Sequence, residues 1–249
     1  MKILRGLLLA ACLILGMQTA NATSKKHEVA MNATFVLYGR SAERETDHAP
    51  LCTAFIYKKA SDGYFLLTAG HCFSPNAPTD AVYLVAQGQI TEKPDLRPVE
   101  VLNHVDDGKM DVAEIHLKTD KQYPVLELED KPVNVDDDVF YVGYPKMYSQ
   151  IVFTGRVASD LMQTLGPDKE DPCDLCIGRF LVQTGGGTGA SGSPILSERT
   201  GRVIGILEGH LFENGVVVVP TPAIESYYAK VGHSQVEKLK NERSEEKDQ

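Results

Sequence analysis

The chain has 249 residues, with 34 acidic and 25 basic side chains and a formal net charge of −9 at pH 7. This acidity argues against nucleic acid or an anionic membrane surface as a partner, because both carry negative charge and would repel the protein. The length is sufficient for one two-lobed unit or two small domains with a sizeable core.

The N-terminus has the pattern of a secretory signal peptide. Lys2 and Arg5 are positively charged, residues 7–17 form an apolar stretch too short to span a bilayer, and Ala20-Asn21-Ala22 supplies small residues for cleavage. We therefore expect residues 1–22 to be removed, no further membrane span, and a secreted protein, periplasmic or extracellular. The alternative is lipidation of Cys12, but the apolar stretch continues beyond that cysteine, which favours cleavage after Ala22.

Four cysteines remain after removal of the signal peptide: Cys52, Cys72, Cys173 and Cys176. An even number of cysteines in an oxidising compartment predicts two disulfides. Four cysteines allow three pairings, and the spacing alone does not choose among them.

Short apolar or alternating runs, separated by Gly, Pro, Asn and Asp, dominate the chain and predict an all-β protein, with helical periodicity almost absent until the end. The strands predicted in the first half are Thr34–Tyr38, Cys52–Tyr57, Tyr64–Thr68, Ala81–Ala86, Val99–Asn103 and Val112–Leu117. Those predicted in the second half are Val139–Tyr144, Ile151–Ala158, Phe180–Thr184, Ile195–Ser197, Val203–Leu207 and Val216–Val219.

The strands fall into two groups, which predicts two β lobes. A polar, Pro-containing passage at residues 118–137 separates the groups, so we place one lobe in residues 23–120 and the other in residues 121–233. The second lobe is expected to end in a short helix that begins at Thr221. Residues 234–249 are mostly charged and lack the apolar side chains that offset ordering entropy, so a disordered tail is predicted.

A glycine-dense turn, Gly187-Thr188-Gly189-Ala190-Ser191-Gly192-Ser193-Pro194, precedes an apolar strand. A serine nucleophile needs such a turn, because its hydroxyl must be exposed beside backbone N–H groups that face the developing oxyanion. A phosphate-binding loop is the alternative, but that loop requires a lysine after the glycines and a following helix. The sequence therefore predicts Ser191 as a nucleophile.

His71 follows a strand that ends in small residues, Thr68-Ala69-Gly70. Histidine is the side chain best suited to exchange a proton near neutral pH, although most histidines in a protein are structural. The neighbouring Cys72 distinguishes His71 from the other six histidines, because a disulfide there would hold the base rigidly.

Three aspartates, Asp106, Asp107 and Asp111, are candidates for the carboxylate that orients the histidine. Asp111 directly precedes the apolar pair Val112-Ala113 and opens an alternating strand. Its carboxylate is therefore the one most suited to being buried against an imidazole.

In this order, Thr68-Ala69-Gly70-His71-Cys72, Asp111-Val112-Ala113 and Gly189-Ala190-Ser191-Gly192-Ser193-Pro194 resemble the motifs of the trypsin/chymotrypsin-like serine peptidase family. The order His, Asp, Ser differs from that of subtilisin-like and α/β-hydrolase enzymes. The resemblance implies two six-stranded antiparallel β-barrels with the triad in the cleft between them.

The resemblance also implies a disulfide between Cys52 and Cys72, which leaves Cys173 and Cys176 to pair with each other. A redox or zinc role for the second pair is the alternative. No βαβ pattern and no second ligand pair accompany it, so a structural disulfide is favoured.

By the same resemblance, His71 removes the Ser191 proton, Asp111 orients the ring, and the N–H groups of Gly189 and Ser191 form the oxyanion hole. Ala190 stands where zymogen-type relatives carry an aspartate. Together with Val142-Gly143-Tyr144-Pro145, this resembles the bacterial trypsin-like and glutamyl-endopeptidase branch.

The specificity pocket of the family corresponds to the region of Gly185, Leu207 and His210. Gly185 carries no charge, which argues against cleavage after Lys or Arg. The histidine with which the family recognises glutamate is replaced by Leu207, while His210 lies nearby in sequence and is either a substitute or a partial closure of the pocket. A small or apolar substrate side chain is expected, with glutamate as the alternative.

The sequence therefore predicts a secreted serine endopeptidase that hydrolyses proteins or peptides through an acyl-enzyme intermediate. We expect a monomer that uses no cofactor and no metal. The alternative hypothesis is a catalytically silent double-barrel binding protein, because a fold alone does not establish activity.

Overall fold

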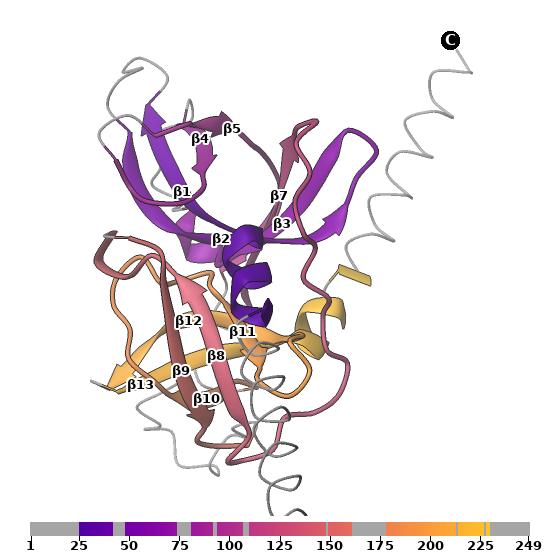
Figure 1. The fold of residues 1–249 in the computed structure, drawn as a ribbon, viewed down its shortest axis with the longest axis vertical. Coiled ribbons are helices and arrows are strands. Elements are labelled where there is room, and N and C mark those ends of the chain that lie inside the picture. The colour runs from indigo at the N-terminus through magenta and orange to yellow at the C-terminus, as the bar shows by residue number, and fades with distance from the viewer. Residues whose placement is uncertain are drawn as a thin grey trace, which may run out of the picture.

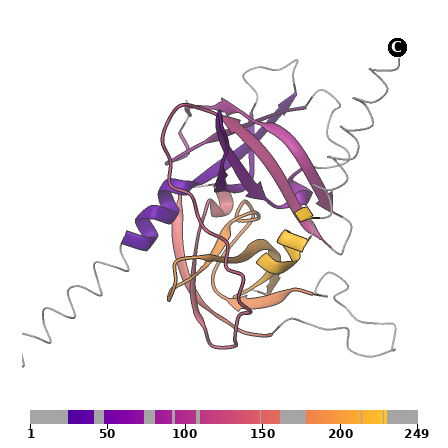
Figure 2. The same cartoon turned by 90° about the vertical axis from the view of Figure 1, so that its right-hand side faces the viewer.

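The computed structural model describes residues 25–41, 48–73, 81–91, 94–106, 110–147, 149–160, 178–212, 214–226 and 228–229. Their strands form two sheets, which build the two lobes seen one above the other in Figures 1 and 2. This arrangement confirms the predicted all-β fold with two lobes.

The first lobe is a seven-stranded antiparallel sheet with the order β5-β4-β1-β2-β3-β7-β6. Its strands are β1 (Thr34–Ser41), β2 (Ala49–Lys59), β3 (Gly63–Thr68), β4 (Ala81–Ala86), β5 (Arg97–Pro98), β6 (Glu100–Asp106) and β7 (Asp111–Lys118). The sheet forms a half-barrel. Strand β5 was not predicted, because two residues are too few for an alternating pattern.

The second lobe is a closed six-stranded barrel with the order β10-β13-β12-β11-β8-β9. Its strands are β8 (Asp138–Gly143), β9 (Ile151–Val157), β10 (Phe180–Gln183), β11 (Pro194–Ser197), β12 (Val203–Phe212) and β13 (Gly215–Pro220). Each sequence-predicted strand in the second half coincides with one of these. The closed ring leaves no unpaired edge in this lobe.

A hydrophobic cluster joins the two lobes. It includes Phe55 and Val112 from the first sheet and Phe140, Leu196 and Ile206 from the barrel, all fully or almost fully buried. Burial of one such side chain contributes about 1.5–3 kcal/mol. The cluster therefore fixes the position of one lobe relative to the other, and with it any site that both lobes build.

Residues 25–33 form a helix that the sequence patterns did not predict. Ala30 and Ala33 are completely buried in the cluster between the lobes, and His27 pairs with Glu198 across 3.0 Å. In Figure 2 the indigo helix lies at the level where the two lobes meet. Nine residues with so few large apolar side chains carry little helical signal, so packing against the barrel stabilises this helix.

Residues 221–226 and 228–229 are also helical, which agrees with the predicted C-terminal helix at its first residues. The predicted signal peptide at residues 1–22, the predicted tail at residues 234–249, and both Cys173 and Cys176 lie outside the described residues. Among the helices that the structure describes, none has the length and apolar character needed to cross a membrane.

Candidate active site

His71 lies in the 3₁₀ turn η1 (Gly70–Cys72), which begins two residues after the end of β3. Gly70 permits this turn to approach β6, because a Cβ at that position would lie 2.0 Å from the carbonyl oxygen of Val105. The His71 side chain is 40% exposed, so the imidazole is presented to the surface between the lobes.

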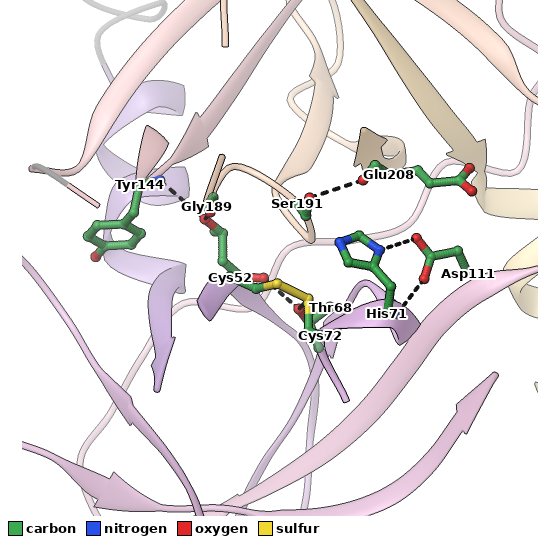
Figure 3. Close-up of a disulfide and its surroundings, with 10 residues drawn as sticks. Cys52, Thr68, His71, Cys72, Asp111, Tyr144, Gly189, Ser191 and Glu208 are labelled. Atoms are coloured by element: carbon green, nitrogen blue, oxygen red, sulfur yellow. Dashed lines mark hydrogen bonds and ion pairs between the residues drawn. A yellow bond between two sulfur atoms is a disulfide. The ribbon is translucent and has the colours of Figure 1, made fainter. Parts of the chain in front are cut away.

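Asp111, the first residue of β7, holds His71 through two hydrogen bonds. Its Oδ1 accepts the backbone N–H of His71 at 2.7 Å, and its Oδ2 lies 2.7 Å from Nδ1 of the imidazole (Figure 3). Because an ionised carboxylate only accepts, Nδ1 carries the proton and Nε2 is the basic nitrogen. The Asp111 side chain is 3% exposed, as burial against the imidazole requires.

The side chains of the other two candidate aspartates are not among the described parts of the structure. Asp106 is the backbone partner of Asp111 in the ladder between β6 and β7. Its side chain, and the whole of Asp107, lie outside the described residues.

A disulfide joins Cys52 of β2 to Cys72 of η1, which confirms that pairing. The link ties the turn that carries His71 to the sheet behind it. Cys52, His71 and Cys72 place three potential metal-ligand atoms within 4.8 Å of one another. Both sulfurs are consumed by the disulfide, and metal coordination by cysteine requires the thiolate, so the oxidised site does not suit a metal.

Ser191 lies on the glycine-dense turn between β10 and β11, in the second lobe. Gly189 and Gly192 both adopt positive φ angles, +93° and +85°. A Cβ on Gly192 would lie 2.0 Å from the carbonyl oxygen of Thr53 in β2. Glycine at this position therefore lets the turn reach the first lobe, where His71 and Asp111 are located.

The Ser191 hydroxyl donates a hydrogen bond to the backbone carbonyl of Glu208 in β12, at 3.0 Å (Figure 3). Within the described part of the chain this is the hydrogen-bond partner of the hydroxyl. The oxygen is thus held beside the imidazole but is not bonded to it. A rotation about the Cα–Cβ bond of Ser191 is the motion that would redirect the hydroxyl.

The backbone amides of Gly189 and Ser191 are the two predicted oxyanion-hole donors. The turn is closed by hydrogen bonds from Ala190 N to Gly187 O and from Ser193 N to Ala190 O, both at 3.0 Å. Among the described residues, no acceptor is bonded to the N–H of Gly189 or of Ser191. Two unused donors on one tight turn can receive a negatively charged oxygen.

Thr53 connects the turn that carries Ser191, the candidate nucleophile turn, to the first lobe, and was not singled out from the sequence. Its N–H donates to Ser191 O at 2.8 Å, and its hydroxyl donates to Gly189 O at 2.9 Å. The hydroxyl also accepts the N–H of Tyr144 at 3.1 Å, and the Thr53 carbonyl accepts the hydroxyl of Thr68 at 2.7 Å. A fully buried threonine with all these groups satisfied is a rigid support for the turn.

Glu208 is a second residue that the sequence analysis missed. Its carboxylate forms an ion pair with Arg179, which lies just before β10, with Nε 2.7 Å from Oε2. Burial raises the pKa of Glu208, whereas the hydrogen bond and charge of Arg179 oppose that rise. Nothing in a local pattern indicates this pair, because 29 residues separate its two members.

The three predicted specificity residues occupy different surroundings. Gly185 accepts the Tyr141 hydroxyl at 2.9 Å and lies against the ring of Phe153, which stacks on Tyr141. The exposed His210 ring lies against Gly186, where a Cβ would be 2.2 Å from His210 Cε1. The side chain of Leu207, in contrast, is fully buried in the barrel core.

Leu207 contacts the nucleophile turn through its backbone. Its N–H donates to Ser193 O at 3.0 Å, and its carbonyl accepts Gly192 N–H at 2.7 Å. Two stacked aromatic rings, those of Tyr141 and Phe153, and the exposed imidazole of His210 therefore lie near the turn that carries Ser191.

Comparison with known families and folds gives a consistent result. A model of the trypsin-like peptidase domain matches residues 52–206, more than half of the chain. The comparison with curated protein sequences found no match to this chain.

Solved structures match at low identity. The chain is similar to the Rv3671c protease of M. tuberculosis in its inactive form, with 19% identity, a TM-score of 0.60, and coverage of 84% of this chain and 93% of that one. The active form of that protease gives 16% identity, a TM-score of 0.60, and coverage of 83% and 84%. The serine endoprotease of Yersinia pestis gives 16% identity, a TM-score of 0.62, and coverage of 84% and 65%.

Proposed function

The chain belongs to the trypsin-like peptidase family, and from this we propose that it hydrolyses peptide bonds with Ser191 as nucleophile, His71 as general base and Asp111 as orienting carboxylate. The observation that carries the proposal is the pair of 2.7 Å hydrogen bonds between His71 and the buried Asp111. They leave Nε2 as the basic nitrogen on the side from which Ser191 approaches.

The reaction begins when the Ser191 hydroxyl leaves the Glu208 carbonyl and turns to His71 Nε2. The imidazole takes the proton as Oγ attacks the substrate carbonyl, and the resulting oxyanion is received by the amides of Gly189 and Ser191. Imidazolium then gives the proton to the leaving amine. Water attacks the acyl-enzyme by the reverse route and releases the product acid, so the cycle requires no cofactor.

The substrate side chain that precedes the cleaved bond is proposed to be small or apolar. Gly185 and the half-buried ring of Phe153, which stacks on the buried ring of Tyr141, offer an uncharged surface. A charged substrate side chain would lose its hydration there without gaining a partner. His210, and the exposed Lys146 side chain that lies against Gly187, could favour glutamate instead.

We propose a secreted protein. The disulfide between Cys52 and Cys72 supports an oxidising compartment, and the N-terminal sequence has the form of a cleavable signal peptide.

The proposal is tested by incubating the protein with a peptide library and sequencing the products. Wild type is expected to cleave peptides after small or apolar residues, and Ser191→Ala is expected to abolish cleavage while the protein remains folded. Cleavage that survives in Ser191→Ala would remove Ser191 from the reaction. A folded wild type that binds peptides without cleaving them would favour the catalytically silent double-barrel binding protein.

A further inference from the structure

The buried ion pair of Arg179 and Glu208 lies next to Ser191, whose hydroxyl donates to the Glu208 carbonyl. The Arg179 side chain is 2% exposed and that of Glu208 is 12% exposed, and two contacts of 2.7 and 3.4 Å join the guanidinium to the two carboxylate oxygens. Withdrawing two opposite charges from water is costly, and a pair of apolar side chains often serves stability equally well. Stability alone therefore does not explain why charges occupy this position.

The backbone of Glu208 is aimed at Ser191 by an irregularity in β12. The pairing of β12 with β13 shifts register between Leu207 and Gly209, so Glu208 is the extra residue. A β-bulge of this kind re-aims the groups of the residue it contains. Here the Glu208 carbonyl accepts the Ser191 hydroxyl at 3.0 Å, while the carboxylate is clamped by Arg179.

The carboxylate of Glu208 also lies within the electrostatic reach of the other two triad members. Besides burial and Arg179, the charge of Asp111 raises the pKa of Glu208 and that of His71 lowers it. Interaction between charges is mutual, so an ionised Glu208 stabilises a protonated imidazole. Figure 3 shows the two parts of Glu208 in these roles, with its carbonyl at Ser191 and its carboxylate on the side of Asp111.

We propose that Glu208, clamped by Arg179, is a positioning residue for the peptidase reaction. Its carbonyl fixes the resting place of the Ser191 hydroxyl, and its carboxylate contributes to the field in which the His71 imidazole gains a proton. The charged groups that act on its carboxylate are Arg179, just before β10, Asp111 of β7 and His71 of η1. The inference rests on the proposed triad chemistry and names residues outside that triad.

The test measures kcat and KM across pH for wild type and Glu208→Gln with the best library peptide. Removing the carboxylate charge makes the imidazolium less favourable. We therefore expect the acid limb of kcat/KM to move to lower pH by about half a unit. Loss of the clamp on the carbonyl is expected to reduce kcat about tenfold with KM little changed.

Glu198→Gln is the matched control. Glu198 is also a partly buried glutamate of the second lobe in an ion pair, but its partner is His27 of the N-terminal helix. That variant should keep the wild-type acid limb and kcat. If the Arg179–Glu208 pair were merely structural, Glu208→Gln would behave like this control: its thermal midpoint would fall and its acid limb would stay in place.

A second variant covers the case in which Glu208→Gln does not fold. The double variant Arg179→Met, Glu208→Leu removes both charges and leaves no unpaired ion. Loss of the Arg179 cation partly offsets loss of the Glu208 anion, so its acid limb should move to lower pH by less than in Glu208→Gln, while kcat should fall as in that variant. An unchanged acid limb and kcat in a folded variant would overturn the proposal, as would failure of both variants to fold, which would assign the pair to stability. An inactive wild type would instead refute the proposed function itself, so the two failures are distinguishable.

Discussion

At the residue scale, the proposed role of Asp111 is to set the tautomer of His71. Asp111→Asn keeps the shape but places an amide N–H opposite Nδ1, which forces the imidazole proton onto Nε2, where the base is needed. In the template serine protease this exchange lowers kcat about 10⁴-fold, and we expect a loss of that order here, measured as turnover at neutral pH.

The chain supplies a matched control for this substitution. Asp62 and His116 form a second aspartate–histidine pair in the first lobe, at 3.0 Å. Asp62→Asn should leave turnover unchanged. Similar losses in both variants would show that the effect comes from folding and not from His71.

Thr53 acts on the site through backbone geometry. Thr53→Val keeps the shape but removes the hydroxyl that bonds Gly189 O and Tyr144 N. We expect the free energy of unfolding to fall by about 1–3 kcal/mol in urea titration, because buried groups lose their partners. Turnover should fall as well, since the Gly189 N–H is one of the two proposed oxyanion donors.

Thr53→Ser retains the hydroxyl and is the control for Thr53→Val. It should keep most of the activity and lose only the stability that belongs to one methyl group. A valine variant as active as the serine variant would remove Thr53 from the support of the turn.

The difference between the residues that were predicted and those that were missed follows from sequence separation. His71 and Ser191 lie in local motifs whose residue types match their chemistry. The hydroxyl of Thr53 reaches partners 136 and 91 residues away, and nothing near Thr53 in the chain signals either contact. Arg179 and Glu208, which are 29 residues apart, likewise show no local sign of their ion pair.

At the scale of elements, the nucleophile turn depends on a glycine that combines positive φ with close approach. Gly192 and Gly88 have nearly equal φ angles, +85° and +86°, but only a Cβ at Gly192 would collide, with Thr53 O at 2.0 Å. Gly88→Ala is expected to cost about 1 kcal/mol of backbone strain. Gly192→Ala should cost clearly more in urea unfolding and should also reduce turnover.

The pair of glycine variants separates conformation from contact. Equal destabilisation by the two alanines would mean that the turn shifts to accommodate the extra Cβ at residue 192 at no additional cost. In that case the close packing of the turn on β2 would not be what positions Ser191.

Elements with regular periodicity were predicted well, and short or context-dependent ones were not. Strands such as β7 and β8 alternate or are continuously apolar, so their patterns are sufficient. The helix at residues 25–33 derives its stability from Ala30 and Ala33 packed between the lobes, and strand β5 is only two residues long. Neither packing between distant residues nor a two-residue strand can be detected in a local sequence pattern.

At the scale of the whole molecule, the candidate site exists only where the two lobes meet. His71 and Asp111 belong to the first lobe, while Ser191 and Glu208 belong to the second. The order of the three motifs along the chain was enough to predict that division by resemblance. The way in which the lobes are joined, through Thr53 and the cluster around Phe55 and Ile206, required the three-dimensional structure.

The most direct test of the account is labelling by a serine-directed fluorophosphonate, with the modified residue identified by mass spectrometry. Folded wild type should be labelled at Ser191. Labelling should be absent in Ser191→Ala and much slower in His71→Ala, because the hydroxyl then lacks its base. A folded wild type that is not labelled, or a label on another serine that persists in Ser191→Ala, would contradict the assignment of Ser191 as nucleophile.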